Sequence, residues 1–268
     1  YWLSLVCICA FPKLLMIGLS DAHVGGDSFV YLKVAENIFA NSCVSLSDPA
    51  SEFCAPHWGG NQLPGYPAFI AATWMMFGKS VFAVLFSQVA FFALVSGYLC
   101  KVLARTDNGI FQNTKVILAV ALLLGASPSL IGWSRAILTE TLSIALALWL
   151  LAELVASLQD RRLRIFRIGI VLTLGVFVRY DFAMFVVPVA AVGFYLHAPM
   201  VAIRKGSCIA LIVLVPLGGW TARCVYQGLD YTPPYGLTPE GQNLPAGMLR
   251  WVGTWLDNQY ELEKSVWA

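Results

Sequence analysis

The sequence predicts an all-α polytopic membrane protein, and three observations support that prediction. Of the 268 residues, 59% are hydrophobic and only 12% are charged, with a mean hydropathy of +0.72, whereas soluble domains are about 45–50% apolar. Apolar stretches recur at lengths that suit membrane helices, and most charged residues lie between them. The net charge of +2 is dispersed, which excludes the concentrated basic face of a nucleic-acid-binding protein.

The expected membrane spans follow from the length of these stretches. A bilayer core of about 30 Å requires about 20 apolar residues in a helix, and fewer where neighbours cover a short end. We expect a transmembrane bundle over residues 1–224, with a first outer loop at 20–79, and a second outer segment at 225–268. The chain starts without methionine inside an apolar run, so we expect a piece of a longer protein. The seven candidate spans are 1–19, 80–104, 115–126, 136–158, 165–178, 182–196 and 207–224.

The basic residues predict the orientation of the bundle. Three turns, around 101–115, 161–167 and 204–205, hold nine of the 17 Lys and Arg residues, while only three of the 15 acids lie in or beside them. Loops rich in Lys and Arg stay on the cytoplasmic side. The first span therefore runs outward, and both polar segments face the periplasm or an equivalent lumen.

A polar island at residues 25–67 interrupts the apolar sequence after the first span. Apolar residues recur with helical spacing from Asp27 to Phe39, which predicts an amphipathic helix along the membrane surface. Asp27 stands at its start, where a carboxylate can simply cap free N–H groups. A second surface helix is expected from Tyr66 to Phe77, ended by Gly78. Because the island also holds acids, glycines and a histidine, it is a candidate reaction chamber.

Two cysteines, Cys43 and Cys54, lie in this island on the oxidising side of the membrane. A disulfide between them would fix the shape of the loop, but two free thiols are equally compatible with the sequence. The other five cysteines lie in or beside spans and are expected to be small packing residues.

Four segments stand in this order along the chain: GGDSFVYLKVAENIF at 25–39, NQLPGYPAFIAATWMMFG at 61–78, SPSLIGWSRAILTETLSIALAL at 127–148 and VRYD at 178–181. Together they resemble the polyprenol-phosphate-sugar-dependent glycosyltransferases of the membrane-embedded GT-C class. The nearest group contains the protein O-mannosyltransferases and the bacterial lipid A aminoarabinose transferases, a glycosyltransferase family 39-like group. The resemblance implies an inverting transfer of sugar from a polyprenyl-phosphate carrier to a glycan, lipid or protein, at the periplasmic face of a bacterial inner membrane.

The resemblance assigns catalytic roles to two acids. Asp27 matches a first-loop acid that takes the acceptor proton or orients the acceptor, and Glu140 matches a second acid at the outer end of the fourth span. Transfer from a lipid phosphate requires such a carboxylate near the attacking hydroxyl. A carboxylate such as Glu140 inside an apolar helix is costly unless it faces a cavity, a partner or an ion.

Two arginines are candidates for binding the departing phosphate. Arg179 and Arg135 both lie at the outer ends of spans, where a guanidinium can hold phosphate through two hydrogen bonds. The alternative for both is that they extend to lipid headgroups, which are also phosphates.

Three further residues of the first outer loop are weaker candidates. Some relatives bind a divalent ion, so His57 with Asp27 or Glu140 could form a metal site, although a plain loop histidine has the same appearance. Trp58 and Tyr66 could stack on a sugar or on the acceptor, but aromatic residues are common at membrane interfaces anyway.

A transporter or lipid flippase, or a non-catalytic membrane subunit, would have a similar hydropathy pattern. Transporters keep ionisable or helix-breaking residues near the bilayer midplane within repeated halves. Here only Lys13 and Pro216 are obvious midplane exceptions, the acids gather at the outer rim, and the sequence shows no internal repeat. The membrane glycosyltransferase is therefore the preferred hypothesis.

Overall fold

The structure is a computed structural model that describes residues 2–25, 27–44, 63–106, 109–226, 235–237 and 243–245. Nearly all of these residues are helical, which confirms the all-α membrane fold. Only the short strands β1 (Tyr235–Leu237) and β2 (Asn243–Pro245) depart from it in the described part, as an antiparallel pair. The helices are α1 (Trp2–Leu19), α2 (Asp27–Asn41), α3 (Gly65–Phe77), α4 (Val81–Leu103), α5 (Gly109–Gln112), α6 (Thr114–Ala126), α7 (Pro128–Ser134), α8 (Thr139–Gln159), α9 (Ile165–Val178), the 3-10 helix η2 (Tyr180–Phe185), α10 (Val186–Leu196) and α11 (Pro199–Tyr226).

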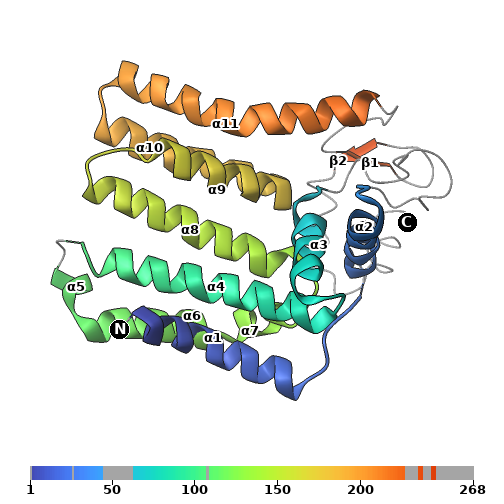
Figure 1. Cartoon of the computed structure of the whole chain (residues 1–268). Coiled ribbons are helices and arrows are strands. Elements are labelled where there is room, and N and C mark those ends of the chain that lie inside the picture. The colour runs from blue at the N-terminus through green and yellow to red at the C-terminus, as the bar shows by residue number, and fades with distance from the viewer. Residues whose placement is uncertain are drawn as a thin grey trace.

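The long helices form a bundle with a common axis. Figure 1 shows α1, α4, α8, α9 and α11 side by side, each packed against the next. Helix α6 packs on α1 and α4, and α10 packs on α11. The main buried core lies between α3, α4, α8 and α9, where apolar side chains such as Ile70, Val89, Leu146 and Leu172 meet.

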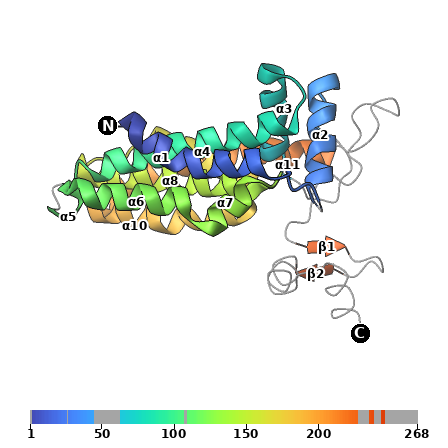
Figure 2. The same cartoon turned by 90° about the horizontal axis from the view of Figure 1, so that it is seen from below.

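Helices α2 and α3 are oriented differently from the rest. Both views show them side by side and crosswise to the bundle axis at one of its ends (Figures 1 and 2). An amphipathic helix crosswise to a membrane bundle lies along the membrane surface. The two surface helices expected in the polar island are therefore present as helices in this orientation.

The number of membrane spans differs from a simple count of apolar stretches. Four helices, α1, α4, α8 and α11, are long and apolar enough to cross a membrane. Helices α6 and α7 make a fifth if their pair, bent by 48°, is one span, while α9 and the η2–α10 pair are shorter apolar helices. All seven predicted stretches are helical, and seven membrane crossings stay a prediction.

Local sequence signals explain several helix ends. The Ser80 side chain accepts a hydrogen bond from the Ala83 N–H and caps α4, and Asn113 caps α6 through the Lys115 N–H. Pro128 begins α7, since its missing N–H is not needed in the first turn. Gly78 follows α3 with a φ of 84°, a backbone conformation that favours glycine.

Two predicted helix boundaries were wrong, the first of them for a tertiary reason. The stretch 136–158 begins as a helix only at Thr139, because Ala136 pairs with His23 in an isolated parallel bridge. Helix α11 begins at Pro199, so Arg204 and Lys205 lie inside a helix rather than in a turn. They still lie near the end of the bundle that carries the other basic turns, opposite α2 and α3.

Lys13, one of the midplane exceptions, has a structural role. It is fully buried in α1, and its Nζ donates to the carbonyl oxygens of Leu124 at 2.6 Å and Gly125 at 2.9 Å. These carbonyls belong to the last turn of α6, where helical partners are missing. Lys13 therefore ties α1 to the break between α6 and α7.

Candidate active site

The candidate active site lies where α2 and α3 cross the ends of the bundle helices (Figure 1). Glu140 is in the first turn of α8, and Arg179 directly follows the last residue of α9. A carboxylate in a first turn is stabilised by the helix dipole. Residues 39 positions apart in the chain thus meet at one membrane surface.

Arg179 forms ion pairs with two acids, Glu140 and Asp181. Its Nη1 donates to Glu140 Oε1 at 3.0 Å, while its Nε and Nη2 donate to the Asp181 carboxylate at 3.1–3.2 Å. Burial disfavours the charge of Arg179, but the hydrogen bonds and negative charges of Asp181 and Glu140 outweigh this and raise the pKa of the guanidinium. Side-chain exposure of 32% for Arg179 and 26% for Glu140 leaves the pair open to a ligand.

The second oxygen of Glu140 has a different environment. Glu140 Oε2 is buried and has no hydrogen-bond partner among the described residues, and the same holds for Arg135 Nε. A buried polar atom left unpaired costs about 1–3 kcal/mol. One acceptor and one donor at this end of the bundle therefore have unsatisfied hydrogen-bonding capacity among the described residues.

Tyr66 is fully buried instead of open to a sugar. Its ring meets Tyr31 of α2 edge-on at 5.2 Å and stacks with Phe69 at 6.3 Å between ring centres. Burial, together with nearby Tyr31 and Glu140, raises the pKa of its hydroxyl, which stays protonated and donates to Gln88 Oε1 at 3.1 Å. Tyr66 therefore packs between α2, α3 and α4, and stacking of its ring on a sugar or acceptor stays a prediction.

Gln88 of α4 fixes the segment that leads into Glu140. Its Nε2 donates to the carbonyl oxygens of Ser134 and Ala136, both at 3.1 Å. The other side of this segment pairs with His23, whose N–H donates to the Arg135 carbonyl at 2.9 Å. The backbone around Arg135 is therefore held by α4 and by the loop that leaves α1.

The Arg135 side chain contacts the loop that leaves α1. Its Nη2 donates to the Asp21 carbonyl oxygen at 3.4 Å, while its Nε is the unpaired donor described above. Arg135 and Arg179 thus lie at the same end of the bundle, on the segments that precede α8 and follow α9.

Asp27 is exposed at the start of α2. Next to the start of the helix, the Gly25 N–H donates a hydrogen bond to Ser28 Oγ at 3.3 Å. The Asp27 carboxylate makes no hydrogen bond or ion pair among the described residues. Tyr31, one turn later on the same helix face, contacts Tyr66 and contributes to the raised pKa of Arg179. Helix α2 therefore turns the face that carries Asp27 toward the candidate site.

An apolar cavity of about 450 Å³ lies between α3, α4, α8 and α9. Val178, one of its lining residues, immediately precedes Arg179. Gly65 allows α3 to close the cavity, since a Cβ there would lie 2.5 Å from the Phe177 carbonyl oxygen. Lining residues include Pro64, Gly65, Leu142, Leu146, Phe177 and Val178.

A comparison with protein families identifies the chain. The profile described as dolichyl-phosphate-mannose-protein mannosyltransferase matches residues 61–220. The chain belongs to this family. Neither a search of curated proteins nor a search of solved structures found a match. The chain is therefore an integral membrane glycosyltransferase of a family whose sugar donors are carried on polyprenyl phosphate, as the sequence motifs indicated.

The match covers most of the candidate site of this glycosyltransferase. Tyr66, Gln88, Arg135, Glu140 and Arg179 lie inside the matched residues 61–220. Asp27 precedes the match, and its assignment depends on the sequence motif at 25–39 and on its place in α2.

Three residues of the glycosyltransferase site were missed from the sequence. Gln88 could have been noticed as an amide inside the apolar span 80–104, because such a group needs a buried partner. Tyr31 had no separate signal within the amphipathic pattern. Asp181 was seen only as the residue that ends VRYD, and its contact with Arg179 required coordinates.

Several expected site residues lie outside the described part. His57, Trp58 and Cys54 are among them. Cys43 is disulfide-bonded, but its partner is outside the described residues, so pairing with Cys54 stays a prediction.

A metal site that includes His57 stays a prediction, because His57 lies outside the described residues. No group of three His, Cys, Asp or Glu side chains that could hold a metal ion exists among the described residues. One oxygen of Glu140 is bonded to the Arg179 guanidinium, whose charge would repel a divalent cation at this carboxylate.

Proposed function

We propose that this protein transfers a sugar from a polyprenyl-phosphate carrier to an acceptor hydroxyl, at the membrane face where α2 and α3 lie. The single observation that carries the proposal is the Glu140–Arg179 ion pair with its unpaired Glu140 oxygen. Val178, which immediately precedes Arg179, lines an apolar cavity. By the distribution of basic residues, this face is the periplasmic or lumenal one.

The lipid-linked donor would lie with its prenyl chain on apolar surface and its phosphate at the charged residues. Its prenyl chain fits the apolar cavity between α3, α8 and α9, since burial of each CH₂ group contributes about 0.8 kcal/mol. Its phosphate would then reach Arg179, which keeps its charge, with the unpaired Nε of Arg135 as a second donor. A guanidinium stabilises the phosphate most when the glycosidic bond breaks and negative charge develops on the leaving oxygen.

The chemistry requires a base on the acceptor side. The acceptor oxygen forms a bond to C1 of the sugar while the bond from C1 to the phosphate oxygen breaks, with inversion at C1. Polyprenyl phosphate leaves with the electron pair, and the acceptor proton passes to the Asp27 carboxylate. Asp27 suits this role because it is exposed and makes no hydrogen bond or ion pair among the described residues.

Glu140 would orient Arg179 and the sugar rather than remove the acceptor proton. One of its oxygens holds Arg179 in place, and the other is available to accept a hydrogen bond from a sugar hydroxyl. A positioned acceptor of this kind adds to catalysis by fixing the reacting atoms.

The test is sugar transfer by the purified protein in liposomes supplied with a polyprenyl-phosphate-linked sugar and an acceptor extract, with products measured by mass spectrometry. Asp27→Asn should lower the turnover by about 10²–10⁴-fold, the usual contribution of a general base. Glu36→Gln is the matched control: it changes an acid on the same helix that forms an exposed ion pair with Lys79.

The control should retain wild-type turnover, because exposed ion pairs contribute little to stability. Transfer by Asp27→Asn within a few-fold of the wild type, at equal protein levels, would remove Asp27 as the base. Absence of any transfer by the wild type from a range of polyprenyl-phosphate sugars would instead oppose the proposed reaction itself.

A further inference from the structure

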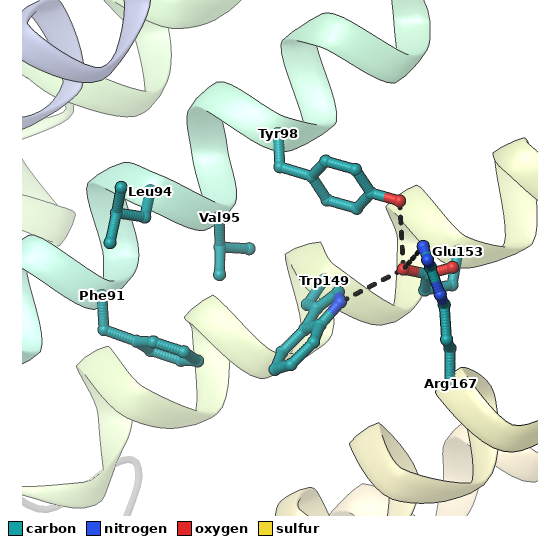
Figure 3. A pocket seen from close by; sticks show the side chains of 7 residues that line it. All are labelled: Phe91, Leu94, Val95, Tyr98, Trp149, Glu153 and Arg167. Atoms are coloured by element: carbon teal, nitrogen blue, oxygen red, sulfur yellow. Dashed lines mark hydrogen bonds and ion pairs between the residues drawn. The ribbon is translucent and has the colours of Figure 1, made fainter. Parts of the chain in front are cut away.

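A second pocket lies toward the end of the bundle that is opposite the candidate active site. Its volume is about 370 Å³, and it is open to the bundle surface between α4 and α8. Glu153, at its polar end, is 13 residues after Glu140 on α8, a separation of about 20 Å along a helix. Figure 3 shows its lining, which is Phe91, Leu94, Val95, Tyr98, Trp149, Glu153 and Arg167.

Glu153 is already satisfied without a ligand. Its side chain is only 1% exposed, and its Oε1 accepts from the Tyr98 hydroxyl at 3.0 Å and from Trp149 Nε1 at 3.3 Å. Arg164 donates to Glu153 Oε2 at 3.1 Å. A carboxylate with one cation and three hydrogen bonds needs no further charge to remain buried.

Arg167 is in a different situation. Its Nη1 is 3.6 Å from Glu153 Oε1, beyond hydrogen-bond distance, and its side chain is 61% exposed. No hydrogen bond of its guanidinium exists among the described residues. Arg167 is therefore held beside Glu153 by an ion pair, as Figure 3 shows, while its guanidinium keeps its hydrogen-bond capacity at the polar end of the pocket.

Basic residues outnumber acids around the polar end of the pocket, where Arg164 pairs with Glu153 and Asp160. Residues 161–167 contain four arginines and no acid, and they connect α8 to the first turn of α9 at this end of the bundle. Basic pockets between membrane helices bind anionic lipid headgroups. A planar guanidinium is well suited to phosphate because it can donate two hydrogen bonds in parallel.

The rest of the pocket is apolar and fits a hydrocarbon chain. Leu94 and Val95 of α4 line it together with Phe91 and Trp149, whose rings meet at 6.1 Å. Phe91 and Trp149 also line the apolar cavity of the candidate active site. This aromatic pair therefore forms a shared wall between the two pockets.

We propose that this second pocket binds one anionic phospholipid from the leaflet opposite the candidate active site. Its phosphate bonds to Arg167, and an acyl chain lies over Leu94 and Val95 as far as the Phe91–Trp149 wall. The proposal does not depend on the sugar-transfer reaction, since Arg167, Leu94 and Val95 line neither the candidate active site nor its apolar cavity.

The test is native mass spectrometry of the detergent-solubilised chain titrated separately with dioleoylphosphatidylglycerol and dioleoylphosphatidylcholine. The wild type should bind one phosphatidylglycerol about tenfold more tightly than phosphatidylcholine, the gain expected from about 1.4 kcal/mol of charge-assisted hydrogen bonding. Arg167→Gln should remove this preference. Leu94→Trp, which fills the groove from an exposed position, should weaken the binding of both lipids.

Arg162→Gln is the matched control, because Arg162 is an exposed arginine of the same segment that does not line the pocket. It should keep the wild-type preference. Equal affinity of the wild type for both lipids would overturn the proposal, and so would an unchanged preference in Arg167→Gln. An equal loss in both arginine variants would also overturn it, since this would indicate general attraction to the basic segment.

Discussion

Replacement of Arg179 by Gln separates the catalytic from the structural contribution of the candidate site. The change removes the ion pairs to Glu140 and Asp181 and the guanidinium assigned to the donor phosphate. Because Arg179 and Glu140 are 32% and 26% exposed, water can replace the lost contacts, and the stability cost should be on the order of 1 kcal/mol. A fully buried pair broken on one side would cost about 3–5 kcal/mol.

The expected loss of activity is larger than the loss of stability. Removal of one group that stabilises developing charge lowers turnover by about 10²–10³-fold, or about 2.7–4 kcal/mol. The neighbouring acids raise the pKa of Arg179, so the wild-type guanidinium stays charged at any working pH. The ratio of wild-type to Arg179→Gln turnover should therefore be the same at about pH 6 and about pH 8, far below the ordinary arginine pKa.

The assay is single-turnover transfer from a polyprenyl-phosphate sugar in liposomes, with the melting temperature measured on the same preparations. Arg105→Gln, at an exposed arginine at the other end of the bundle, is the control and should keep both values. Arg179→Lys should recover part of the activity, since it restores the charge but not the two-pronged geometry. Turnover of Arg179→Gln within about threefold of the wild type would refute the assignment, because removal of a group that stabilises developing charge should lower turnover at least about 100-fold.

Two further predictions concern the residues that hold the site in place. Gln88→Leu leaves the Tyr66 hydroxyl and two backbone carbonyls without their partner. The free energy of unfolding should fall on the order of 3 kcal/mol, which lowers the melting temperature and reduces sugar transfer. An unchanged melting temperature would contradict this role of Gln88. Lys13→Met removes the donor to the last carbonyls of α6, so proteolysis near the α6–α7 break should become faster, whereas wild-type protease resistance would show that the break does not need Lys13.

The candidate site was partly accessible from sequence motifs. Glu140 and Arg179 were identified by their motifs and by their positions at the outer ends of spans, and the structure brings them into contact. Tyr66 was selected for an aromatic ring at an interface, but sequence does not show whether such a ring is open or covered. Gln88 was missed because its partners are backbone carbonyls 46 and 48 residues away.

The sequence by itself determined the fold class, the positions of the apolar helices, the two surface helices and the separation of acids from basic turns. These properties depend on residue type and local periodicity, because an apolar segment in a bilayer must satisfy its backbone groups within a helix and basic loops stay on the cytoplasmic side. Only the tertiary structure decided that His23 shortens the start of α8, that Lys13 joins α1 to the broken α6–α7 pair, and that Glu140 keeps one oxygen unpaired beside Arg179. Each of these facts is a contact between segments far apart in the chain, and such contacts arise from packing rather than from local pattern.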